Sequence, residues 1–272
     1  MKEIEDDGGN QSTKVHDRVQ AQFGAAAPAY TTSVGHGDQT MLQHVVDLAR
    51  PERGDHVLDV ATGAGHTALA LAPHVAEVIA YDITQQMLDE TARNAAARGL
   101  DNVRARQGIA EALPFADASF EIVTVRQAPH HFADVQAAIR EMARVVKPRG
   151  RVLVVDSHVP EEDALADALN HIEKLRDSSH VRSYRPSEWR VMMRAAGLRI
   201  VAEELDYYTE NGGPMDFDKW TSRIKTPPDA VVELRRLLRN ASPELAAAIK
   251  LEIASDRIGF CVPQITIVAT KD

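Results

Sequence analysis

The sequence contains a single cysteine, Cys261, and no apolar run long enough to cross a membrane. One cysteine excludes an intrachain disulfide and any zinc site built from several cysteines. It also fits a reducing compartment. A membrane-spanning helix needs roughly 20 apolar residues, and the acidic, polar residues 1–10 do not resemble a secretory signal. We therefore expect no membrane span and a cytoplasmic location.

The sequence also lacks an excess of positive charge and an internal repeat. Its 31 Lys and Arg residues are outnumbered by 40 Asp and Glu residues, so the net charge is −9. A general nucleic-acid-binding protein usually presents a basic face, and we expect no nucleic-acid partner here. The hydrophobic fraction of 44% and the length of 272 residues fit one large globular domain.

Strands and helices alternate between about residues 40 and 156. The apolar run at 152–155 is typical of a parallel strand buried on both faces. Such alternation predicts a doubly wound α/β fold with a mostly parallel sheet. Strands are predicted at 57–60, 75–81, 103–107, 120–125 and 152–155, and helices at 39–48, 67–71, 84–98 and 134–146.

The alternation breaks after Asp156. We predict helices at 160–177, 186–196, 217–224, 229–238 and 243–253, and strands at 198–205 and 265–269. Residues 1–12 are expected to be disordered, with a helix from about 13 to 24 and a loop or short helix at 25–37. A single domain over 13–272 follows, with a core at about 40–156 and 186–272. Helical cap insertions at 13–39, 157–185 and 214–255 are expected to cover the carboxyl ends of the strands.

A glycine-containing turn between a strand and a helix is the main functional signal. Asp59 stands near the end of the strand, Gly63 and Gly65 form the turn, and a helix starts near His66. Glycine lacks a Cβ, so a ligand can lie close to the backbone. The first turn of a helix carries unsatisfied N–H groups, and open α/β sheets bind ligands at the carboxyl ends of their strands. These features predict a nucleoside-cofactor site.

Five motifs in the order expected for one enzyme family support that prediction. They comprise the glycine motif at 58–65, the segment 81–84 with Met87, and the segments 107–115, 119–123 and 140–150. With these motifs the chain resembles a class I S-adenosylmethionine (SAM) dependent methyltransferase. More narrowly, it resembles the small-molecule branch that includes the ubiquinone/menaquinone C-methyltransferases. The resemblance implies a seven-stranded Rossmann-like fold, SAM as cofactor and S-adenosylhomocysteine (SAH) as product.

The resemblance implies a role for each residue of the cofactor site. Gly63 and Gly65 would admit the methionine part of SAM, and Asp59 would attract its ammonium group directly or through water. Asp82, 17 residues after Gly65, would accept both ribose hydroxyls. The further positions assigned to the cofactor are Tyr30, which would close over it, Ile83 and Met87 beside the adenine, and Ala61, Gly108, Ile109, Ala110 and Arg126.

One position departs from the family pattern. Many relatives carry an acid where this chain has Ile109, and that acid accepts from the adenine amino group. Here the contact falls to the backbone, to Glu111 or to water, while Ala110 offers its backbone N–H to an adenine ring nitrogen.

Candidate catalytic residues follow the fourth strand. Methyl transfer needs a base only if the acceptor atom carries a proton, and His130 and His131 titrate near neutral pH. Packing or capping is the alternative role for either one, and His36, His158 and Asp156 are weaker candidates. Adjacent histidines point apart, so we expect no metal. The basic residue Arg176 and the segment 180–185 are interpreted as a mildly basic, flexible segment, which could meet an acidic acceptor but is more often a solvated face.

Two other functions remain as alternatives. The pattern Gly63-x-Gly65-x-x-Ala68, with Asp82 at a suitable distance, partly fits a nicotinamide-dependent dehydrogenase. The chain could also be a SAM-binding protein without catalysis. The main prediction is methyl transfer from SAM to an O, N or C atom of a small organic acceptor. The acceptor itself is not determined by the sequence, and a homodimer is left open.

Overall fold

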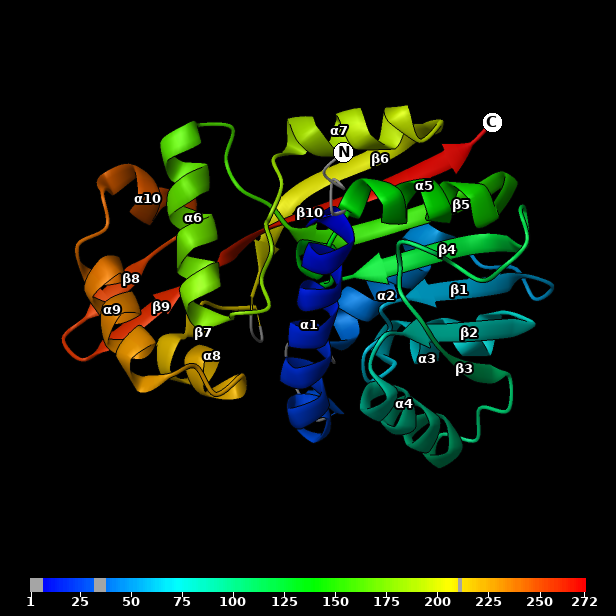
Figure 1. Ribbon diagram of the computed structural model, residues 1–272, viewed down its shortest axis with the longest axis horizontal. Helices are drawn as coiled ribbons and strands as arrows, with labels where there is room; N and C mark the ends of the chain where they lie inside the picture. The colour runs from blue at the N-terminus through cyan, green and yellow to red at the C-terminus, as the bar shows by residue number, and fades with distance from the viewer. Residues whose placement is uncertain (1–6, 32–37, 210–211) are drawn as a thin grey trace, which may run out of the picture.

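The computed structural model describes residues 7–31, 38–209 and 212–272. Its core is a seven-stranded sheet in the order β3-β2-β1-β4-β5-β10-β6, in which only β10 runs antiparallel to its neighbours (Figure 1). The prediction of a doubly wound, mostly parallel seven-stranded sheet is therefore confirmed. The strands are β1 His56–Val60, β2 Glu77–Asp82, β3 Val103–Gln107, β4 Phe120–Arg126, β5 Val146–Ser157, β6 Leu198–Tyr208 and β10 Val262–Lys271.

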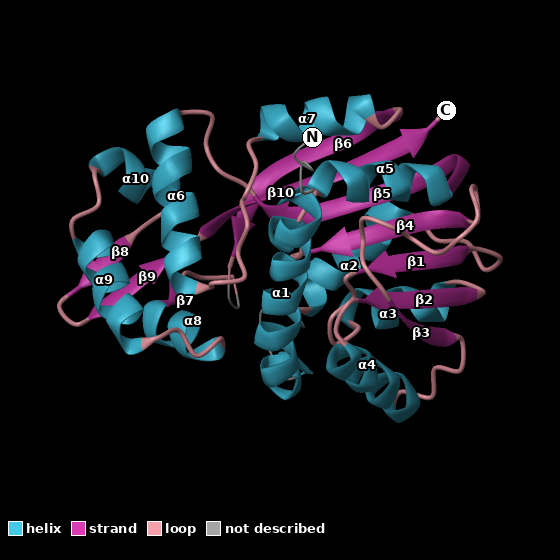
Figure 2. Cartoon of the chain, viewed as in Figure 1, coloured by secondary structure: helices cyan, strands magenta, loops and turns pink. Residues whose placement is uncertain are grey.

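Helices cover both faces of this sheet, as Figure 2 shows. Neighbouring residues of a strand point to opposite faces, so Leu58 packs with α5 and α7, whereas Val57 packs with α2 and α3. The helices and short 3₁₀ turns of the core are α2 Gln39–Ala49, α3 His66–Leu71, η1 Ala72–His74, α4 Gln85–Ala97, η2 Pro129–His131, α5 Val135–Val145 and α7 Pro186–Ala195.

A second group of elements, the cap, has its own apolar core around Phe217, Trp220, Leu234 and Phe260. In Figure 1 the cap lies at the left, beside the carboxyl end of β5. It consists of α6 Asp163–Arg176, α8 Phe217–Arg223, α9 Pro228–Arg239, α10 Pro243–Ala248 and a small antiparallel sheet of β7 Met215–Asp216, β9 Arg257–Phe260 and β8 Glu252–Ala254.

The predicted helix at 243–253 is wrong over its last turn. Helix α10 ends at Ala248, and Lys250 adopts a positive φ of 48°. Ile253 then pairs with Ile258 in the hairpin of β8 and β9. A helix-forming sequence is overridden here because the strand pairing extends the small sheet of the cap.

The amino-terminal prediction also needs correction. Helix α1 runs from Asp7 to Thr31 without a break, so residues 7–12 are helical and not disordered, and the helix also covers 25–31. Gln20 Nε2 donates to the carbonyl oxygen of Ile83 at 2.9 Å, and Gln22 Nε2 donates to that of Ile224 at 2.9 Å. Helix α1 therefore connects the core to the cap (Figure 1). Tertiary contacts of this kind stabilise helices that sequence propensity alone does not predict.

Candidate functional site

A cavity of about 950 Å³, its mouth included, opens at the carboxyl ends of β1, β2 and β4. Small-molecule pockets typically have volumes of roughly 300–1,000 Å³. The β1–α3 loop, the end of β2, the segment after β3, the end of β4 and helix α1 form its walls. Ten of the predicted cofactor residues line it: Asp59, Ala61, Gly63, Asp82, Ile83, Met87, Gly108, Ile109, Ala110 and Arg126.

Gly63 and Asp82 form the centre of this cavity. Asp82 Oδ2 accepts a hydrogen bond from the Gly63 backbone N–H at 2.9 Å, and Oδ1 accepts one from Thr84 N–H at 2.8 Å. A Cβ built on Gly63 would meet no atom within 4 Å, so the space above this glycine is open. Burial raises the pKa of Asp82 to about 6, although the hydrogen bonds from the two N–H donors lower it in part. The carboxyl group is therefore ionised at neutral pH.

Gly65 is not among the residues that line the cavity, and its contact with the methionine part stays a prediction. Its φ is 87°, and a Cβ here would lie 2.7 Å from Thr91 Cγ2 of helix α4. Glycine is required at this position because α4 packs against the turn and because the backbone is left-handed. Gly65 shapes the loop, whereas Gly63 faces the ligand space.

Asp59 holds the glycine loop together. Its carboxylate accepts from Thr62 Oγ1 at 2.6 Å, from Thr124 Oγ1 at 2.6 Å and from Ala68 N–H at 3.1 Å. Burial raises the pKa of Asp59, whereas these hydrogen bonds lower it in part. The carboxylate thus connects β1, β4 and the start of α3, and its contact with the cofactor ammonium stays a prediction.

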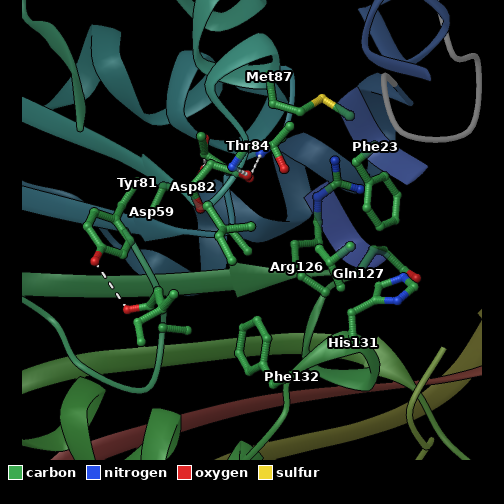
Figure 3. Close-up of a pocket in the computed structure, with 18 of the residues that line it drawn as sticks. Phe23, Asp59, Tyr81, Asp82, Thr84, Met87, Arg126, Gln127, His131 and Phe132 are labelled. Atoms are coloured by element: carbon green, nitrogen blue, oxygen red, sulfur yellow. Dashed lines mark hydrogen bonds between the residues drawn. The ribbon is translucent and has the colours of Figure 1, made fainter. Parts of the chain in front are cut away.

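Arg126 ends β4 and supplies the positive charge in this cavity. Its Nε donates to Thr67 Oγ1 at 3.0 Å, and burial lowers the pKa of its guanidinium. Figure 3 shows Arg126 next to Gln127, with Phe23 and His131 at the same end of the cavity, whereas Tyr81 lies at the other end. A guanidinium here can bind a carboxylate.

Ile83, Met87 and the segment after β3 form a further part of the cavity wall. Gly108 is needed there because a Cβ would come within 2.0 Å of Tyr81 Oη, which donates to the carbonyl oxygen of Ile109 at 3.1 Å. Glu111, which the sequence offered as an adenine contact, also lines the cavity, and its Oε1 accepts from Ala133 N–H at 2.9 Å. The contact with an adenine by the backbone of residues 109–110, by Glu111 or by water stays a prediction.

Helix α1 contributes residues that the sequence did not predict. His16, Val19 and Phe23 line the cavity, and His16 Nε2 lies 3.4 Å from Glu111 Oε2. No motif marks them, because only the tertiary structure places α1 over the strand ends. Tyr30 belongs to the last turn of α1, but its side chain and residue His36 lie outside the described residues.

The rings of the two adjacent histidines lie 4.2 Å apart between centroids, so the expectation that they point apart is wrong, although their Nδ1 atoms have different partners. His131 lines the first cavity, its Nδ1 lies 3.1 Å from the carbonyl oxygen of Ser179, and burial together with the neighbouring His130 lowers its pKa to about 3. His130 Nδ1 lies 2.5 Å from Asp156 Oδ1. Burial lowers the pKa of His130, but the charge and hydrogen bond of Asp156 outweigh it and raise the pKa above its ordinary value.

The structure also places His158 and the segment 180–185, which the sequence singled out. His158 lies in a separate small cavity beside the cap, with its Nδ1 3.2 Å from the carbonyl oxygen of Val159. The segment 180–185 is not a solvated face, because His180 is only 3% exposed and bonds Asn170. Within the described part of the chain, no group of three or more metal-ligating side chains could hold a metal ion.

Comparison with known proteins agrees with this geometry. Residues 58–154 match the family model described as "Methyltransferase domain". The chain is 42% identical to the uncharacterized methyltransferase YcgJ of Bacillus subtilis over 222 residues. This alignment covers 80% of this chain and 86% of YcgJ. The chain belongs to the class I SAM-dependent methyltransferases.

The fold of the methyltransferase is shared with solved structures. The crystal structure of YcgJ matches it with a TM-score of 0.79 at 38% identity, over 85% of this chain and 98% of YcgJ. The demethylmenaquinone methyltransferase of Thermus thermophilus is 40% identical over 124 residues, which are 45% of this chain and 56% of that protein. The family match does not favour the dehydrogenase alternative. Among residues 7–31, 38–209 and 212–272, no helix is both long and apolar enough to cross a membrane.

Proposed function

We propose that this methyltransferase moves a methyl group from SAM to an O, N or C atom of a small organic acceptor, with SAM bound in the first cavity. The single observation that carries the proposal is the pairing of Gly63 with Asp82. The backbone of Gly63 is open to a ligand, and its N lies 2.9 Å from Asp82 Oδ2. The Asp82 carboxylate can also accept hydrogen bonds from the ribose hydroxyls. The product of the cofactor is SAH.

The residues of the cavity fit the chemical parts of SAM. Asp82 is suited to the ribose, Ile83 and Met87 to the flat adenine, and the Ala110 N–H to a ring nitrogen. Arg126 is suited to the methionine carboxylate and Asp59 to its ammonium group. These assignments are supported by the position of each residue in one cavity.

When bound, SAM supplies a methyl group on a positively charged sulfur, which is already activated for transfer. The protein therefore has to orient the reactants and exclude water. Helix α1 can do the latter, because Val19 and Phe23 close one side of the cavity. Gln20 attaches this helix to Ile83, just after β2, and Gln22 attaches it to the cap.

Calorimetric titration tests the proposal. SAM and SAH are expected to bind, and a nicotinamide dinucleotide is not. A labelled methyl donor then separates an active enzyme from a protein that binds SAM without turnover. Absence of SAM binding by the folded wild-type protein would refute the proposal. The cytoplasmic location and the homodimer stay predictions.

A further inference from the structure

A second cavity of about 600 Å³ lies between the core and the cap. It is bounded by η2, the ends of β5 and β6, helices α6 and α8, and β7. Phe23, Gln127 and His131 line both cavities, so the two spaces share one wall. Figure 3 shows Phe23, Gln127 and His131 of this wall at the same end of the first cavity as Arg126. A molecule in the second cavity would therefore be next to the predicted methionine end of the cofactor.

The second cavity is lined by both aromatic and charged side chains. The Arg176 guanidinium lies 4.7 Å from the centre of the Trp220 ring, and Phe23 adds a further aromatic surface at the shared wall. Arg223 and Tyr208 lie at the same cavity. A compact, flat molecule with polar substituents fits such walls better than a long hydrocarbon chain does.

His130 lines the second cavity and is held firmly in place. Its carbonyl oxygen accepts from Val181 N–H at 2.9 Å and from Arg182 N–H at 3.1 Å, while its Nδ1 bonds Asp156 Oδ1 at 2.5 Å. Asp156 is completely buried, and its Oδ2 has no hydrogen-bond partner among the described residues. A carboxylate that accepts from Nδ1–H leaves Nε2 as the nitrogen that can take up a proton.

We propose that the second cavity binds the methyl acceptor, a compact hydroxyaromatic molecule, and that His130, positioned by Asp156, takes the proton of its hydroxyl group. This inference rests on the proposed function. The new bond joins the acceptor oxygen to the methyl carbon as the carbon–sulfur bond breaks with its electron pair on sulfur. The hydroxyl proton goes to His130 Nε2 and later to solvent, so the products are a methyl ether and SAH.

The surroundings of His130 favour it over His131 as the proton acceptor. Asp156 on β5 stabilises a positive imidazolium, and Glu173 on α6 and Asp177 just after it add negative charge. His131 on η2 and His180 in the loop after α6 are the other titratable rings, 4.2 Å and 5.4 Å from the His130 ring between centroids. The Nδ1 of His131 lies 3.1 Å from the Ser179 carbonyl oxygen and 3.3 Å from its hydroxyl oxygen, and neither of these neutral groups stabilises an imidazolium as a carboxylate does.

The probe for this proposal is 4-nitrophenol, whose phenolate form is yellow and whose protonated form is not. The protein saturated with SAH is expected to bind it and to lower its apparent pKa by at least about one unit, a tenfold shift toward phenolate. His130→Gln and Asp156→Asn should each abolish this shift, so that the pH profile of deprotonation returns to that of free 4-nitrophenol. His158→Gln is the matched control, because this histidine also follows a core strand but lies outside both cavities.

Affinity for SAH, measured by calorimetry on every variant, shows that each one is folded. If 4-nitrophenol fails to bind, or if His130→Gln deprotonates it as the wild type does, the inference is overturned while SAH binding leaves the proposed function intact. If the wild type does not bind SAH, the proposed function itself fails. Should His130→Gln not fold, Asp156→Asn tests the same step.

Discussion

The carboxylate of Asp82 accepts a hydrogen bond from the backbone N–H of Gly63 at 2.9 Å, across 19 residues of sequence. This contact joins the tip of β2 to the loop that follows β1. Because of it, the ribose and methionine parts of the proposed SAM site form one unit. Altering the carboxylate therefore affects both halves of the site.

Asp82→Ala is expected to weaken SAM binding by about 1.5–3 kcal/mol, the usual range for hydrogen bonds to a charged group. Asp82→Asn should also weaken it, because an amide accepts fewer hydrogen bonds than a carboxylate. Calorimetry gives the affinities. Asp89→Ala is the control, since this exposed acid of α4 lies outside the cavity and accepts from Gln85 Nε2 at 2.8 Å. An unchanged affinity in Asp82→Ala would show that the ribose assignment is misplaced.

The two glycines of the turn should respond differently to alanine. Both have a positive φ, which costs a non-glycine residue about 1–2 kcal/mol. Gly65→Ala adds a clash with Thr91, so it should lower the unfolding free energy of the protein more than Gly63→Ala does. A second substitution, Thr91→Ala, should restore part of the stability lost in Gly65→Ala. Gly63→Ala should mainly lose SAM affinity. Denaturant unfolding and calorimetry separate the two effects, and equal stability losses would contradict the assignment.

The pKa of Asp82 predicts a specific pH dependence. Burial raises this pKa from 3.8 to about 6, so between these values the folded state holds a proton that the unfolded state has released. The contribution of Asp82 to the unfolding free energy should therefore decrease as the pH rises from about 4 to 6. SAM affinity should instead decrease as the pH falls below about 6, because ribose binding needs the carboxylate. Both trends should be flatter in Asp82→Asn.

Phe23→Ala tests the role of helix α1 as a cover. The Phe23 ring packs edge-on against the His131 ring, with the two ring centroids 4.9 Å apart. An aromatic pair of this kind contributes about 0.5–1.5 kcal/mol to stability. Its loss should open the wall shared by the two cavities and speed SAM dissociation, measured by stopped-flow fluorescence. Arg18→Ala on the exposed side of the same helix is the control. If dissociation is unchanged in Phe23→Ala, α1 does not close the cofactor site.

The sequence by itself determined the doubly wound fold, the glycine turn and the place of Asp82. These features depend on periodicity and on short spacings along the chain, such as the alternation of strands and helices up to Asp156. The sequence could not distinguish Gly63 from Gly65. Only the packing of α4 against Gly65, and the open space above Gly63, separated their roles.

The tertiary structure alone decided which distant side chains meet. It paired His130 with Asp156 across 26 residues, joined Gln20 to Ile83 across 63 and Gln22 to Ile224 across 202. It also turned the end of the predicted helix at 243–253 into a strand. No local pattern encodes such contacts, because they form only when the cap and α1 fold onto the sheet and bury apolar surface together.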